Sequence, residues 1–201
     1  DLSSDTPRPL LPTDTTLFLR ENANYRCSNS ALLPDESAIL VCSRSGRDHQ
    51  LRAFEIRWND GSPQLTAQGP GRKVPYLTGL NTTLNDTPLP GDASIRLVQV
   101  APNGQKLLVG FERPGQNLLL LLNRKPGTAD GATELSFPFY SPDSPEASEQ
   151  CQLLTAATEK LPAAVRFSPD GTLVAALLKI NRSNLQFWKQ QPDGQFTALT
   201  A

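Results

Sequence analysis

The chain repeats one pattern three times at nearly equal intervals. A proline that precedes an apolar run occurs at Pro34, Pro102 and Pro169, 68 and then 67 residues apart. The proline presets the backbone for a tight turn, and the Asp or Asn after it tolerates the next corner. A period of this length predicts stacked supersecondary units, because each unit needs a neighbour to bury its apolar face. This constrains the fold more than any local pattern does.

Each repeat continues beyond the turn in the same order. A second apolar run follows the first, and then come a polar corner and a last short strand. The second runs are Leu51–Trp58, Leu118–Leu122 and Leu185–Trp188, and the last strands are Gln64–Ala67, Thr133–Phe137 and Gln195–Thr200. With the short strand that precedes each proline, every repeat is predicted to have the order strand, turn, strand, loop, strand, turn, strand. This is a four-stranded antiparallel meander.

The third repeat resembles one blade of a WD-repeat or TolB-like β-propeller. Its phrase Ser168-Pro169-Asp170-Gly171 follows a short strand, and the later strand ends in Trp188. In that family the Pro-Asp-Gly phrase closes the innermost strand of a blade, and the strand with the Trp is the third. The middle repeat has Asn103 for Asp and lacks the Trp, and the first has Glu36 where Gly is usual.

The resemblance implies an all-β, β-propeller-like fold with three recognisable four-stranded antiparallel blades. Closed propellers have about 4 to 8 blades, so three make an incomplete or atypical propeller. The predicted parts are an N-terminal arm at 1–26, blade 1 at 27–67, a connection at 68–94, blade 2 at 95–137, a connection at 138–162 and blade 3 at 163–201. Thr15–Leu19 is a candidate closing strand for the last blade.

The second connection is predicted to carry one short helix. Ser144, Pro145 and Glu146 make a good helix start, with Ser as the cap. The apolar residues beyond it recur at helical spacing. They are Leu153, Leu154, Ala157 and Leu161. The first connection, 68–94, is polar and rich in Thr, Pro and Gly, so it is expected to be a long loop.

Charge and missing motifs narrow the function classes. Nineteen Lys and Arg against 20 Asp and Glu give a net charge of −1, without the basic surplus usual in nucleic-acid binders. No apolar run reaches the ~18 residues of a membrane span. The single histidine, His49, is expected in a polar loop at 43–50, and no second His exists to form a ligand pair for a metal. No nucleophile elbow or phosphate loop occurs. We expect no cofactor, no metal and no catalytic residue.

The acidic and amide residues at the turns have a structural explanation. Asp35, Asn103 and Asp170 recur in register and invite a calcium or catalytic interpretation. However, short polar side chains commonly cap the backbone at turn corners. With Pro34, Pro102, Pro169 and Gly171 they are predicted to be structural turn residues.

Arginines recur in the loops that join the second and third strands of the repeats. They are Arg44 and Arg47, then Arg113, then Arg182. In a propeller these loops emerge on one face, where guanidinium groups favour partners that carry carboxylates or phosphates. The alternative is that these loops carry charge for solubility.

The sequence predicts a non-catalytic protein-binding or scaffold module that presents loops to a partner or a larger assembly. The alternative is a hydrolase-type enzyme, or a propeller subunit gating one, with acidic residues near a central channel. Three blades leave two exposed sheet edges, which act as templates for association. Completion by a protein partner, a second copy or further sequence is therefore expected.

Three cysteines bear on the redox setting. Cys27 and Cys42 are candidates for a short disulfide loop, which leaves Cys151 odd. The chain has no Met and no targeting segment at its start, which fits either an exported mature chain, periplasmic or lumenal, or a cytoplasmic one.

Overall fold

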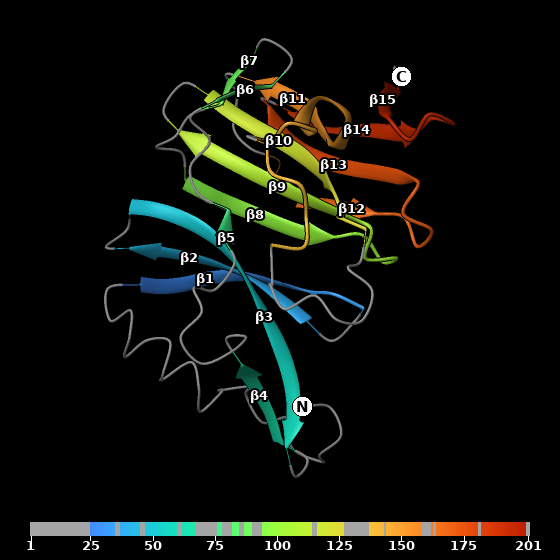
Figure 1. Cartoon of the computed structure of the whole chain (residues 1–201). Helices are drawn as coiled ribbons and strands as arrows, with labels where there is room; N and C mark the ends of the chain where they lie inside the picture. The colour runs from blue at the N-terminus through green and yellow to red at the C-terminus, as the bar shows by residue number, and fades with distance from the viewer. Residues whose placement is uncertain are drawn as a thin grey trace.

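The chain folds into three large antiparallel β-sheets that lie side by side, and the described residues also form a separate two-stranded hairpin (Figure 1). The structure is a computed structural model. It describes residues 25–34, 37–44, 47–59, 62–66, 76–77, 82–84, 87–89, 94–113, 116–126, 137–142, 144–157, 162, 164–180 and 182–199. The predicted N-terminal strand at Thr15–Leu19 lies outside these residues. Within them, no helix is both long enough and apolar enough to cross a membrane.

Each large sheet is one blade with four strands in chain order, and the first sheet has one further strand that pairs with β3. Blade 1 contains β1 (Tyr25–Leu32), β2 (Ser37–Arg44), β3 (Arg47–Asn59) and β4 (Ser62–Thr66). Blade 2 contains β8 (Ser94–Val100), β9 (Lys106–Arg113), β10 (Gln116–Asn123) and β11 (Cys151–Ala157). Blade 3 contains β12 (Ala164–Phe167), β13 (Leu173–Ile180), β14 (Arg182–Gln190) and β15 (Phe196–Leu199). The all-β, propeller-like fold with three blades is confirmed.

The fourth strand of blade 2 lies where the sequence predicts a helix, so the helix prediction was wrong over 151–157. The helix α2 is a single turn at Ala147–Gln150, and β11 begins directly after it. β11 pairs with β10 from Asn117 opposite Ala157 to Leu122 opposite Cys151. A strand here satisfies the backbone N–H and C=O groups along the edge of β10, which a helix would leave open.

Two smaller predictions for this connection also fail. Ser144 does not cap the helix through its side chain; its hydroxyl is buried without a hydrogen-bond partner, and the N-cap residue is Glu146. Phe137 belongs to no strand, and the rest of the predicted strand, 133–136, lies outside the described residues. Blade 2 thus runs past 137 to Ala157.

The connection between blades 1 and 2 is less irregular than its composition predicts. It contains β5 (Tyr76–Leu77), β6 (Thr82–Leu84) and β7 (Thr87–Leu89). β5 pairs with β3 beside Leu51 and Arg52, where β4 does not reach. β6 and β7 form a hairpin beside β11 (Figure 1). These short strands cover sheet edges that would otherwise be open.

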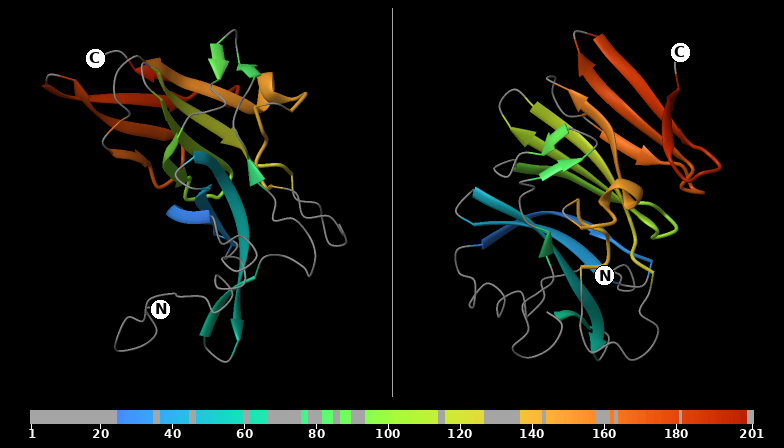
Figure 2. Two further views of the ribbon diagram at one scale, coloured as in Figure 1. Left: turned by 90° about the vertical axis from the view of Figure 1, so that its left-hand side faces the viewer. Right: turned by 45° about the horizontal axis from the view of Figure 1, so that its top comes forward.

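The middle blade is buried on both faces. Leu118, Leu120 and Leu122 pack toward blade 1, whereas Leu119 and Leu121 pack toward blade 3. All five are at most 3% exposed. A sheet with one solvated face alternates apolar and polar residues, but a sheet between two others needs apolar residues at consecutive positions. This explains the unbroken run of leucines. Figure 2 shows blade 2 between its two neighbours.

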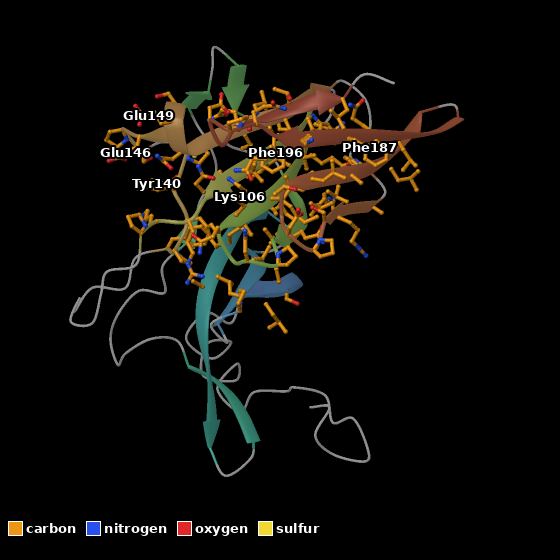
Figure 3. The ribbon with its side chains drawn as sticks, turned by 90° about the vertical axis from the view of Figure 1, so that its right-hand side faces the viewer. Lys106, Tyr140, Glu146, Glu149, Phe187 and Phe196 are labelled. Atoms are coloured by element: carbon orange, nitrogen blue, oxygen red, sulfur yellow. The ribbon has the colours of Figure 1, made fainter. Side chains whose placement is uncertain are left out.

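Polar contacts join blades 2 and 3 beside the apolar cluster. The Lys106 ammonium donates to Asn123 Oδ1 at 2.9 Å and lies 5.5 Å from the centre of the Phe196 ring (Figure 3). Burial lowers the pKa of Lys106. The Phe196 backbone N–H donates to Gln152 Oε1 at 2.7 Å, and the Gln152 amide donates back to the Phe196 carbonyl. These contacts bind the outer strand of one blade to the next.

The proline turns of successive blades lie against each other. Gly104 has φ +70°, and a Cβ built there would lie 2.9 Å from Pro34 Cδ. Gly171 has φ +73°, and its Cβ would lie 3.1 Å from Asn103 Nδ2. Only glycine meets both demands, a left-handed backbone and a neighbour this close. The turns therefore form one rim of the stack of blades.

Candidate functional site

The first strands of the three blades converge on a cavity. β1, β8 and β12 are each an edge strand of their sheet, and together they line an open cavity of about 420 Å³. This is the position of a propeller's axis. The lining residues are Ser30, Ala31, Leu32, Leu97, Val98, Gln99, Val100, Ala164, Val165 and Arg166.

Arg166 dominates the chemistry of this axial cavity. Among the described lining residues it is the only ionisable one, and its side chain is exposed. One guanidinium nitrogen donates to the Val165 carbonyl at 2.7 Å. The other lining residues are of apolar type apart from Ser30 and Gln99, but most of the surface that they expose to the cavity is polar. The cavity suits a small anionic group, such as a carboxylate, that also accepts hydrogen bonds from polar atoms of the wall.

Sequence reasoning did not single out Arg166 as a site residue. The available signal was an arginine inside the short apolar strand Val165–Phe167, where an exposed cation has no role in the core. That signal is visible in the local sequence. The position of Arg166 at the cavity depends on the tertiary structure, which brings β12 next to β1 and β8.

The predicted arginines lie at equivalent hairpin ends. Arg44 is opposite Arg47 where β2 turns into β3. Arg113 is opposite Gln116 at the end of β9, and Arg182 is opposite Ile180 at the start of β14. In each blade this hairpin lies at the far end of the second strand from the proline turn. Their side chains lie outside the described part of the structure.

These hairpins share one end of the stack of blades. The proline turns are neighbours, because Gly104 touches Pro34 and Gly171 touches Asn103. The second strands all leave that rim and end at the arginine hairpins. The hairpins β2–β3 and β9–β10 lie on the left of Figure 1.

The turn residues make local hydrogen bonds. The Asp170 carboxylate accepts from the Thr172 backbone N–H at 3.1 Å, the Thr172 hydroxyl at 2.9 Å and the Ser168 hydroxyl. The Ser168 hydrogen bond, followed by those from Thr172, lowers the pKa of Asp170 to about 2. Asn103 Oδ1 accepts from the Gln105 N–H at 3.0 Å. Asp35 lies outside the described residues.

Two further predictions concern side chains with metal or redox chemistry. His49 lies within β3, opposite Ser43, so its placement in a loop was wrong. Within the described residues, no group of three His, Cys, Asp or Glu side chains could hold a metal. Cys27 and Cys42 are direct cross-strand partners, and Cys151 is a buried free thiol.

Comparisons with known proteins return distant structural likenesses. No family model and no curated protein matches the chain. The β-propeller domain of Cps50 (Swd1) from Myceliophteria thermophila is 13% identical with a TM-score of 0.43, over 96% of this chain and 46% of that one. A candidate 6-phosphogluconolactonase from Bacteroides uniformis is 11% identical with a TM-score of 0.35, over 86% and 55%. The chain spans about half the length of each. At these identities a likeness concerns the fold alone.

Proposed function

We propose that the chain is a non-catalytic protein-binding module whose arginine hairpins hold an acidic segment of a partner. The observation that carries this is the placement of Arg44, Arg47, Arg113 and Arg182 at equivalent hairpin ends of three adjacent blades. Arginine offers a planar fork that binds carboxylate or phosphate bidentately. Several guanidinium groups at one end of the stack of blades can each bind one acidic group of a partner that carries several.

The axial cavity supports the same partner chemistry. Its single ionisable lining residue among those described is a cation, Arg166. An acidic side chain inserted at the axis would meet this guanidinium in a cavity whose lining surface is mostly polar. The alternative, a hydrolase or a subunit gating one, requires carboxylates near the channel, and the described lining residues include none.

Fluorescence polarisation with a labelled acidic peptide, such as oligoglutamate, tests the proposal. Replacing Arg113 and Arg182 together with Ala is expected to weaken binding about tenfold or more, since hydrogen bonds to charged groups contribute roughly 1.5–3 kcal/mol. Raising the salt concentration should weaken wild-type binding in the same direction. The melting temperature should not change.

Two controls sharpen this result. Lys189→Ala removes an exposed cation from β14, away from the hairpins, and should leave peptide affinity unchanged. The Arg113→Lys, Arg182→Lys pair keeps the charge but loses the fork, so it should recover only part of the affinity. Equal peptide affinity of the wild type and the Ala variant would mean that the hairpin arginines serve solubility and do not bind the peptide. Turnover of glycoside or ester substrates by the purified chain would refute the non-catalytic assignment.

A further inference from the structure

The three blades use one packing arrangement twice, and none of the described residues adds a fourth blade at either end of the stack. We call the side of a blade that faces the next blade in the chain its forward face, and the opposite side its backward face. Blade 1 packs its forward face on the backward face of blade 2, and blade 2 does the same with blade 3. Within the part of the chain that the structure describes, the forward face of blade 3 and the backward face of blade 1 have no neighbouring blade (Figure 2).

The forward face of blade 3 repeats the covered forward face of blade 2 position by position. On blade 2, Leu121 lies opposite Leu108, and both are buried under blade 3. On blade 3 the equivalent positions are Phe187 in β14 and Ala175, opposite it in β13. Leu199, in the neighbouring strand β15, also lies opposite Phe187. The next pair on blade 2, Leu119 with Gly110, corresponds to Leu185 with Leu177.

These residues form an apolar surface that lacks a cover. Leu185 is 63% exposed and Leu199 is 44% exposed, and they are two of three large hydrophobic residues so exposed among those described. Phe187 projects from β14 on this side, away from the contact between Lys106 and Phe196 (Figure 3). A solvated sheet face normally carries polar residues, so a contiguous apolar face marks an interface.

The backward face of blade 1 offers a matching set of positions. Leu51 and Ala53 pack toward blade 2, on the forward face. Their neighbours in register fall on the other face of the sheet, because positions alternate along a strand. The pairs so placed are Ala38 with Phe54, Leu40 with Arg52, and Ile56 with Leu65. Apart from Arg52, these positions on the backward face of blade 1 hold apolar residues.

We propose that two copies of the chain close a six-bladed ring. Blade 3 of each copy packs its forward face on the backward face of blade 1 of the other copy. This repeats the packing already present twice in each chain, and the two-fold ring leaves no free blade face. Six blades is an ordinary propeller size. The axial cavity, now lined by β1, β8 and β12, becomes enclosed by six inner strands.

Area favours this ring over two forward faces packed together. Four strands about 4.8 Å apart and about five residues long cover only roughly 19 by 17 Å. Stable complexes bury roughly 800 Å² per partner, so one junction is small and a ring with two is favoured.

Light scattering coupled to size-exclusion chromatography of the full chain tests the ring. We expect twice the chain mass of 21.9 kDa. Leu185→Lys should raise the dimer dissociation constant at least about tenfold, because each ring buries two of these residues at its junctions. Gln105→Lys is the control: Gln105 is exposed in the turn between β8 and β9 of the middle blade, away from both free blade faces, so this variant should remain dimeric.

A mixing experiment identifies which faces meet. Leu40→Lys, on the backward face of blade 1, should dissociate the ring as Leu185→Lys does. An equimolar mixture of the two variants keeps one wild-type junction per pair, so it should associate more tightly than either alone. If Leu40→Lys loses its β-sheet circular dichroism, small-angle scattering of the wild-type dimer gives the answer instead, since a ring and an elongated pair differ in radius of gyration.

The outcomes are distinct. A wild-type chain that stays monomeric over a roughly hundredfold concentration range overturns the proposal. A dimer that survives Leu185→Lys, an elongated dimer, or open polymers of increasing length also overturn it. None of these results depends on whether the hairpin arginines bind a partner.

Discussion

The contact between the turns of blades 1 and 2 makes a sharp prediction for Gly104→Ala. Gly104 and Gly194 both have positive φ, +70° and +87°. An Ala at either position would cost roughly 1–2 kcal/mol from the left-handed backbone. At Gly104 the new Cβ would also lie 2.9 Å from Pro34 Cδ, whereas at Gly194 the nearest atom, Gln190 Nε2, is 3.8 Å away. Overpacking adds about 1–3 kcal/mol. We therefore expect a loss of roughly 2–5 kcal/mol for Gly104→Ala and roughly 1–2 for Gly194→Ala.

A double variant isolates the contact between blades. Pro34→Ala removes the Cγ and Cδ atoms that the new Cβ would meet at 3.1 and 2.9 Å. Added to Gly104→Ala, it should recover the overpacking part of the loss, which gives a coupling free energy of about 0.5–3 kcal/mol between the two positions. The backbone strain would remain.

Urea unfolding followed by circular dichroism measures these free energies of unfolding, with the slope m checked for constancy. The reasoning is refuted if Gly104→Ala and Gly194→Ala cost the same free energy. It is also refuted if Pro34→Ala adds its own cost to Gly104→Ala without any recovery. In either case the turns of the two blades would not be in contact.

Three further predictions concern the core, the turn carboxylate and the cysteines. Leu119 and Leu120 are adjacent and both fully buried. Leu119→Ala and Leu120→Ala should therefore each lower the free energy of unfolding, measured in urea, by about 2–5 kcal/mol. No loss for either variant would mean that blade 2 has a solvated face. The pKa of Asp170 is lowered to about 2, so its stabilisation is complete above the unfolded-state pKa of about 4 and is lost as the pH falls toward 2. The melting temperature of the wild type should therefore exceed that of Asp170→Asn at neutral pH and converge with it across that acidic window; a constant difference would contradict this. Cys27 and Cys42, opposite each other in adjacent antiparallel strands, have a Cα spacing suited to a disulfide, so mass spectrometry of the air-oxidised chain should find them linked, and two free thiols there would exclude the bond.

The sequence by itself determined most of the strands and the turns that join them. The structure of the turns at Pro102 and Pro169 is encoded in the local sequence. Proline sets one backbone dihedral angle, and the glycine permits the positive φ that follows. The side chain of Asn103 or Asp170 accepts a hydrogen bond from the backbone N–H two residues further on. The hairpin positions of Arg44, Arg113 and Arg182 followed from the same repeat. Such features depend on contacts between residues a few positions apart, so a single sequence is sufficient to predict them.

Only the tertiary structure decided what depends on distant partners. The spacing of Leu153, Leu154 and Ala157 fits a helix as well as a strand, and the free edge of β10, across the long connection that begins after Asn123, selects the strand. Arg166 lines the axial cavity because β12 meets β1 and β8, which belong to other repeats. Pairing and blade packing join segments whose separation in sequence leaves no local trace, so their outcome is fixed by which exposed edges and apolar faces remain to be covered.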